Sequence, residues 1–166
     1  MISLEVLRRY PYIAGLSHEQ IVTLARVADE VTVEANHCFF HEGDNLASFY
    51  LVLEGTVAVV IEVPDREVNH NFSAQLTGKL QTTDVVISTV EPGEIFGWSA
   101  LVAPYKATAG GKAISPCRVV VFDCRELRSQ IEEDCQFGYL MMKKIAQIMR
   151  DRLHNMRIEM LPSFVG

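Results

Sequence analysis

The sequence predicts a mainly β fold of antiparallel strands, with short helices before the strands and one long helix after them. Three stretches with different periodicity indicate this order. Apolar residues recur at helical spacing in residues 4–30, the period changes to two from residue 31, and a helical stripe returns in residues 134–160. The length of 166 residues suits one domain. We divide it into N-terminal helices (1–30), a strand region (31–123) and C-terminal helices (125–160).

The N-terminal helices are predicted by apolar spacing and by one helix-start signal. A first apolar face ends before Pro11. Ser17, with Gln20 three residues later, then fits a capping box. The apolar residues that follow at helical spacing are Ile21, Leu24, Ala25 and Ala28. We expect these side chains to pack in the core.

The strand region consists of short apolar runs separated by turn residues. Val31, Val33 and Ala35 alternate with polar neighbours, which is typical of a half-buried strand. We expect strands at residues 31–35, 38–40, 49–53, 56–63, 85–90 and 117–122. His41–Asp44 contains a glycine suited to a turn, and we interpret Glu54–Gly55 as a tight hairpin turn.

Residues 64–84 are polar and form a longer connection than hairpin loops usually have. We expect a long hairpin loop with irregular strand ends. Such a loop suits a partner contact, and it equally suits a tolerated insertion. His70 lies in this loop, and we expect it to be solvated and to bind no ligand.

The stretch from Glu91 to Ala113 carries the strongest functional signal. Gly97 lies at a predicted junction between a strand and a short helical turn. Backbone N–H groups of Ser99 and Ala100 would be free at the start of that turn, where they favour an anion. Lys106 is a nearby cation. The stretch therefore predicts a site for a small anionic ligand.

This stretch resembles the phosphate-binding cassette of the cyclic-nucleotide-binding domain family. The matching residues are Phe96-Gly97, Ala100-Leu101 and Pro104. Residues 42–44 and 49–57 resemble the same family, and the likeness extends over roughly residues 10–155. It implies that the strands form an antiparallel double-stranded β-helix, a jelly roll or β-roll, and that cyclic nucleotides are the ligand class to test.

Two positions depart from the family's cassette. Trp98 stands where the family has the Glu that binds the ribose hydroxyl, and indole is only a donor. The family's phosphate-binding Arg is replaced by Lys106 or by Ala107, neither of which offers a guanidinium fork. Losing two charge-assisted hydrogen bonds weakens binding by roughly two to four decades, so we expect weak cyclic AMP binding. The predicted ligand site is Gly97, Trp98, Ser99, Ala100, Lys106, Ala107 and Thr108.

These residues leave two functions open. The first is a stand-alone regulatory domain that senses a small anionic, nucleotide-like ligand. The second is a degenerate β-roll whose pocket is closed and which acts as a protein-interaction or dimerisation module. An enzyme is a third class that we do not expect, because the five histidines lack the cupin pattern and Gly97-Trp98-Ser99 is not a nucleophile elbow. We expect no metal and no cofactor beyond a cyclic nucleotide ligand.

The long C-terminal helix has an apolar stripe that is rich in methionine. In the family this helix pairs two subunits, which implies a homodimer, and methionine suits an adaptable interface. The residues expected at the dimer interface are Leu140, Met141, Ile145, Ile148, Met149 and Met156. The alternative is that the stripe packs against the chain's own strands.

Composition limits the partners that we expect. The formal net charge is −6, so the chain lacks the basic field of a general nucleic-acid binder. Only LPSFVG follows the helix, so we expect no direct DNA binding and an output through a separate protein partner. No apolar run could span a membrane and no signal peptide is evident, so we expect a cytoplasmic protein. The four cysteines lack metal-ligand spacing, and we expect reduced thiols.

Overall fold

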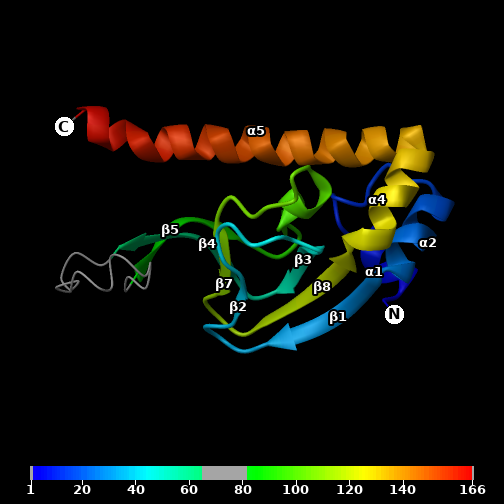
Figure 1. The fold of residues 1–166 in the computed structure, drawn as a ribbon, viewed down its shortest axis with the longest axis horizontal. Helices are drawn as coiled ribbons and strands as arrows, with labels where there is room; N and C mark the ends of the chain where they lie inside the picture. The colour runs from blue at the N-terminus through cyan, green and yellow to red at the C-terminus, as the bar shows by residue number, and fades with distance from the viewer. Residues whose placement is uncertain (1, 65–81, 166) are drawn as a thin grey trace.

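Two antiparallel four-stranded sheets face each other in the computed structural model, which describes residues 2–64 and 82–165 (Figure 1). One sheet has the order β1-β8-β3-β6 and the other β2-β7-β4-β5. The strands are β1 (Ala28–Val33), β2 (Cys38–Phe40), β3 (Ser48–Glu54), β4 (Val57–Pro64), β5 (Thr82–Val90), β6 (Ile95–Phe96), β7 (Gly110–Ala113) and β8 (Cys117–Asp123). The predicted mainly β architecture with flanking helices is confirmed.

The central strands β3 and β8 are buried on both faces. Val52 and Val119, which are register partners, belong to a cluster between the two sheets. Phe49 and Phe122, also partners, stack with ring centroids 4.5 Å apart in a second cluster beneath the helices. Two buried faces explain why these strands read as continuous apolar runs.

The helices are α1 (Leu4–Arg8), α2 (His18–Arg26), α4 (Cys124–Glu133) and α5 (Cys135–Val165). Figure 1 shows α5 lying along the strands, with α1, α2 and α4 gathered where it begins. The capping box is confirmed, because Ser17 and Gln20 exchange both backbone-to-side-chain bonds. The long helix is also confirmed, and it continues through Pro162. No helix in the described residues is long and apolar enough to cross a bilayer.

The connection at Glu54–Gly55 is not a hairpin turn, as we had expected from the sequence. β3 pairs with β6 and β8, whereas β4 pairs with β5 and β7, so the chain passes from one sheet to the other at this point. Gly55 has φ of +84°, and a Cβ there would lie 2.3 Å from the Pro116 carbonyl oxygen. The glycine is therefore required by a close crossing of two backbones.

The expected alternation in β1 is also wrong. Ala28 is buried and Val33 half-buried, but Val31 is exposed, because β1 lies at the edge of its sheet. The predicted loop at residues 64–84 is shorter at both ends, since Pro64 ends β4 and Thr82 begins β5. The rest of that loop, with His70, lies outside the described residues.

Candidate functional site

The cassette begins where β6 ends at Phe96 and a single 3₁₀ turn, Trp98–Leu101, follows. Gly97 joins them with φ of +70°, in the left-handed region. A Cβ at Gly97 would lie 3.1 Å from Cδ2 of Tyr50 and 3.3 Å from Cε1 of Phe40. Gly97 is therefore needed both for the turn and for the aromatic rings packed beneath it.

Arg128 of α4 holds the cassette through two hydrogen bonds. Its Nε donates to the Ala100 carbonyl oxygen at 2.9 Å, and its Nη2 donates to the Leu46 carbonyl oxygen at 2.7 Å. The segment after the turn is held by backbone bonds, in which the Ala107 N–H donates to Asp44 O and the Gly43 N–H donates to Ala107 O, both at 2.8 Å. The cassette is thus a rigid part of the fold.

A small pocket lies against the cassette, with a volume of about 40 Å³. Five residues of the predicted site line it: Gly97, Trp98, Ser99, Ala107 and Thr108. The remaining lining comes from Phe40, Leu46, Val59, Phe96, Ala109, Gly110, Gly111 and Arg152. At roughly 10–15 Å³ for each water, the pocket has room for about three water molecules.

Two residues of the predicted site do not line this pocket. Ala100 is fully buried in the core, and its backbone N–H donates to Gly97 O at 3.0 Å, so that amide is not free for an anion. Lys106 is exposed and forms a β-bridge with Asn45. Because the helical turn has only four residues, its dipole is small, and an anion at this pocket would need a side chain for most of its counter-charge.

Arg152 is a cation in the lining of this pocket, and it is absent from the site predicted from the sequence. Arg152 extends from α5 to line the pocket, and its Nη2 donates to the Ile95 carbonyl oxygen at 2.8 Å. Burial lowers the pKa of Arg152, and the carboxylate of Glu94 acts in the opposite direction. A cation within an otherwise apolar helix stripe was the sequence signal that could have identified it.

Phe40 fills the space beneath the cassette. Its ring is stacked with those of Tyr50 and Phe96, at centroid distances of 6.0 and 6.1 Å. A Cβ at Gly111 would lie 3.0 Å from Cζ of Phe40. Nothing in the local sequence around Phe40 indicated this role, because the ring reaches the cassette only through the pairing of β2 with β7.

A larger cavity of about 240 Å³ lies between α5, the residues after α1 and the turn before β6. Its lining includes Tyr12, Glu94, Lys144, Ile148 and Arg152. Arg152 therefore borders both cavities. In the described residues, no group of three or more His, Cys, Asp or Glu side chains could hold a metal ion.

The residues expected at a dimer interface lie in different environments. Met141 and Ile145 are buried in the chain's own core, so we remove both from the predicted interface. Leu140 and Ile148 are half-buried against that core. Met149 and Met156 are exposed. The first turns of α5 therefore follow the alternative expectation of packing on the chain's own strands, and the later turns do not.

Comparisons with known proteins agree with this geometry. A family model described as cyclic nucleotide-binding domain matches residues 30–134. The crystal structure of a protein proposed to bind cyclic nucleotides, from Geobacter metallireducens, is 30% identical with a TM-score of 0.74. That match covers 93% of this chain and 100% of the other. A cyclic nucleotide-binding domain from Methylobacillus flagellatus shares the fold, with 18% identity, a TM-score of 0.71, and coverage of 98% and 83%.

A curated relative is the CRP-like cAMP-activated global transcriptional regulator of Mycobacterium tuberculosis. It is 22% identical over 152 residues, which is 92% of this chain, and the chain spans 61% of the length of that relative. The family model covers more than half of the 166 residues, and the Geobacter protein matches along almost the whole chain. This chain therefore belongs to the cyclic nucleotide-binding domain family.

Proposed function

We propose that this chain is a regulatory domain that binds a small anionic, nucleotide-like ligand at the cassette, with Arg152 as the counter-charge. Cyclic nucleotides are the first ligand class to test, and we expect them to bind weakly. The role is regulatory and not enzymatic. An unidentified protein partner receives the output.

The observation that carries this proposal is the guanidinium of Arg152 at an otherwise largely apolar pocket. Arg152 is half-buried, and a backbone carbonyl oxygen accepts from one of its five N–H donors, so its other donors can turn to a ligand anion. A ligand phosphate would supply the remaining acceptors. Arg152 would thus replace the arginine that the cassette lacks.

The pocket volume supports a coupling between ligand binding and α5. Pockets for drug-sized ligands have volumes of roughly 300–1,000 Å³, which is well above the 40 Å³ found here. A nucleotide therefore enters only if Phe40 or Arg152 moves aside. Because Arg152 is part of α5, movement of its side chain or its helix would transmit binding to the C-terminal part of the chain.

Isothermal titration calorimetry of the full chain with cyclic AMP, cyclic GMP and dinucleotide second messengers tests the proposal. We expect saturable binding of at least one ligand, and a loss of about tenfold or more in affinity in Arg152→Gln. Lys106→Ala is the matched control and should change affinity less than about threefold. Equal affinity in wild type and Arg152→Gln would remove Arg152 from the site.

A second function, the closed interaction module, is favoured by one observation. Phe40 lines the cassette pocket and stacks on two neighbouring rings, and the space that remains is only about 40 Å³, so the chain itself leaves little room for a ligand. Absence of binding heat with every ligand, for a folded wild-type protein, would select this function. Binding in wild type would reject it.

We also propose that the exposed part of α5 pairs with a second copy of the chain. Met149, Leu153, Met156 and Met160 are exposed and recur at steps of four, three and four residues. This is the spacing that two helices use when they pack as a coiled coil. The spacing supports self-association along this stripe, which retains Met149 and Met156 from the expected interface.

A further inference from the structure

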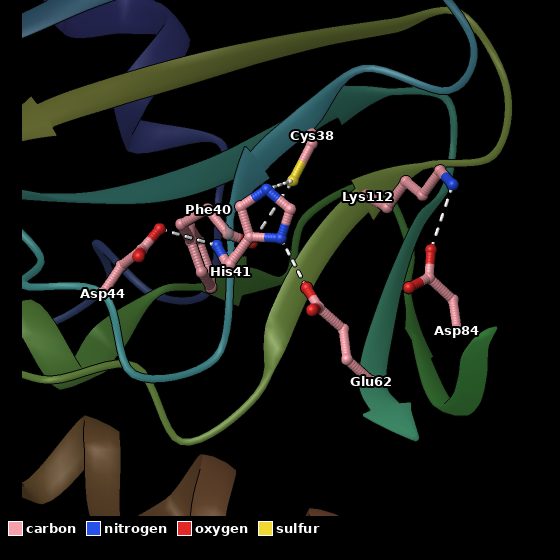
Figure 2. Close-up of polar contacts among 7 residues, drawn as sticks. All are labelled: Cys38, Phe40, His41, Asp44, Glu62, Asp84 and Lys112. Carbon is pink, nitrogen blue, oxygen red and sulfur yellow. Dashed lines mark hydrogen bonds and ion pairs between the residues drawn. The ribbon is translucent and has the colours of Figure 1, made fainter. Parts of the chain in front are cut away.

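Cys38, His41 and Glu62 form a connected series on the outer side of the sheet that contains β2. Figure 2 shows the His41 imidazole between the sulfur of Cys38 and the carboxylate of Glu62. Sγ of Cys38 lies 3.5 Å from Nε2 of His41, and Nδ1 of His41 is hydrogen-bonded to Oε1 of Glu62. A thiol, an imidazole and a carboxylate are therefore arranged as nucleophile, base and orienting group.

The hydrogen bonds determine which nitrogen of His41 can accept a proton. An ionised carboxylate is only an acceptor, so Nδ1 of His41 carries the hydrogen that faces Glu62. In the neutral ring Nε2 then has a free lone pair that faces the Cys38 thiol, whose hydrogen has two acceptors within reach, Nε2 of His41 and the Phe40 carbonyl oxygen, each 3.5 Å from the sulfur. The His41 backbone N–H also donates to Oδ2 of Asp44 at 2.8 Å, which holds the turn that carries the ring.

The series is accessible, and an ion pair between β7 and β5 lies next to it. Cys38 is exposed, and the His41 side chain is 62% exposed. Among the described residues, Lys112 of β7 and Asp84 of β5 form an ion pair of 3.0 Å next to the series. A small solute can therefore reach the sulfur, and Lys112 provides a cation near it.

We propose that Cys38 is a site of reversible thiol modification, where it exchanges with a small disulfide with His41 as the base. Nε2 of His41 takes the thiol proton while Sγ attacks one sulfur of R–S–S–R. The bond between Cys38 Sγ and that sulfur forms as the R–S–S–R bond breaks. The leaving thiolate takes the proton back from Nε2 and departs as R–SH. Cys38 is oxidised to the disulfide level, and the departing half of the reagent is reduced.

Cys38 needs a base such as His41 because its own thiol ionises poorly. Partial burial and then the Glu62 carboxylate raise the pKa of Cys38, so its thiolate is scarce at neutral pH. A thiol of high pKa is a strong nucleophile once its proton is removed. The hydrogen bond to Glu62 raises the pKa of His41, which makes the ring a better proton acceptor. Glu62 acts through His41 and is a positioning residue.

The other cysteines provide an internal comparison. Cys117 and Cys124 are buried, so a disulfide in solution cannot reach them in the folded chain. Cys135, at the start of α5, is exposed like Cys38. Its sulfur makes no hydrogen bond to a histidine among the residues that the structure describes. Exposure alone therefore predicts equal reactivity of Cys38 and Cys135, whereas the proposal predicts a difference.

The test uses the full chain with oxidised glutathione as the disulfide. Reaction is followed by intact-protein mass spectrometry, with Cys135→Ser leaving Cys38 as the exposed thiol and Cys38→Ser leaving Cys135. We expect Cys38 to form the mixed disulfide about a hundredfold faster at pH 7, the low end of what a positioned base provides. His41→Gln in the Cys135→Ser chain should remove this advantage.

The pH dependence of the reaction rate distinguishes His41 acting as a base from His41 acting only as a structural residue. With His41 present, the rate should rise with pH and level off above the raised pKa of the imidazole. Glu62→Gln should move this rise to lower pH, and His41→Gln should move it to the higher pH at which the thiol itself ionises. Equal rates at Cys38 and Cys135, or a profile that His41→Gln leaves unchanged, would overturn the proposal. Circular dichroism confirms that each variant is folded.

Discussion

The guanidinium carbon of Arg128 lies 3.8 Å from the centroid of the Tyr105 ring, so a cation from α4 closes over the segment that follows the cassette turn. The same guanidinium donates to two backbone carbonyl oxygens, those of Ala100 and Leu46. One side chain therefore joins two points of the cassette segment, Ala100 and Tyr105, to Leu46, which is distant from both in sequence. Its loss should affect the whole cassette.

We expect Arg128→Ala to lower the free energy of unfolding by about 2–4 kcal/mol, because two part-buried carbonyl oxygens lose a charged donor. Urea unfolding should show a lower midpoint with an unchanged slope. Arg125→Ala is the matched control on the same helix, since Arg125 is exposed and its ion pair with Asp123 is screened by solvent and should contribute little. Equal losses in both variants would contradict this role of Arg128.

Gly55 and Gly43 have almost the same backbone conformation but different surroundings. Their φ values are +84° and +85°. A Cβ at Gly55 would meet the Pro116 carbonyl oxygen at 2.3 Å, whereas a Cβ at Gly43 has nothing within 4 Å. Both alanine variants carry the left-handed strain of about 1–2 kcal/mol. Gly55→Ala should cost about 2 kcal/mol more, because it also overpacks the crossing between the sheets. Thermal or urea unfolding of the pair measures the difference, and equal losses would show that the crossing relaxes freely.

A charge on the exposed stripe of α5 should prevent self-association. We expect Met156→Glu to be monomeric in light scattering at concentrations where wild type is dimeric, because two carboxylates would be buried together. His154→Glu is the control, since this exposed residue lies two positions away on another side of the helix. Ile145→Glu is unsuitable, because Ile145 is in the core and the variant should unfold. A dimer that survives Met156→Glu would place the interface elsewhere.

The pKa of His41 should lie above the ordinary value of about 6.5, because its ring is hydrogen-bonded to Glu62. A raised folded-state pKa means that this pair stabilises the fold below the unfolded pKa, and that the contribution is lost as pH rises through the folded pKa. The excess stability of wild type over Glu62→Gln should therefore be larger near about pH 6 than near about pH 9. It should stay below about 1 kcal/mol, because the pair is exposed. NMR titration of His41 in both proteins measures the shift directly, and identical titration midpoints would disprove it.

The sequence correctly predicted those parts of the fold that depend on residues close together in the chain. The long helix follows from an uninterrupted 3.6-residue period, and the start of α2 follows from Ser17 and Gln20. The turn at Gly55 was predicted, but its type was not. A hairpin and a crossing between sheets use the same local residues, and they differ only in whether β3 pairs with β4 or with β8.

For the candidate site, too, the sequence predicted the local features and missed the long-range contacts. The glycine and the short turn of the cassette are local features, whereas Arg152 donates to a carbonyl oxygen 57 positions earlier in the chain. Likewise, His41 and Glu62 are 21 positions apart and meet through strand pairing. Contacts of this kind depend on the register of several strands, which residue spacing alone does not determine.

The continuity of α5 has a mechanical consequence. The helix is anchored in the core at Phe137, Met141 and Ile145, passes the pocket at Arg152, and continues without a break to Val165. It can therefore act as a lever whose arm extends about 20 Å beyond Arg152. A tilt of about 5° at the pocket moves the far end by about 2 Å. A partner that holds the last turns would thus detect, as a displacement, an event at a pocket that it never touches.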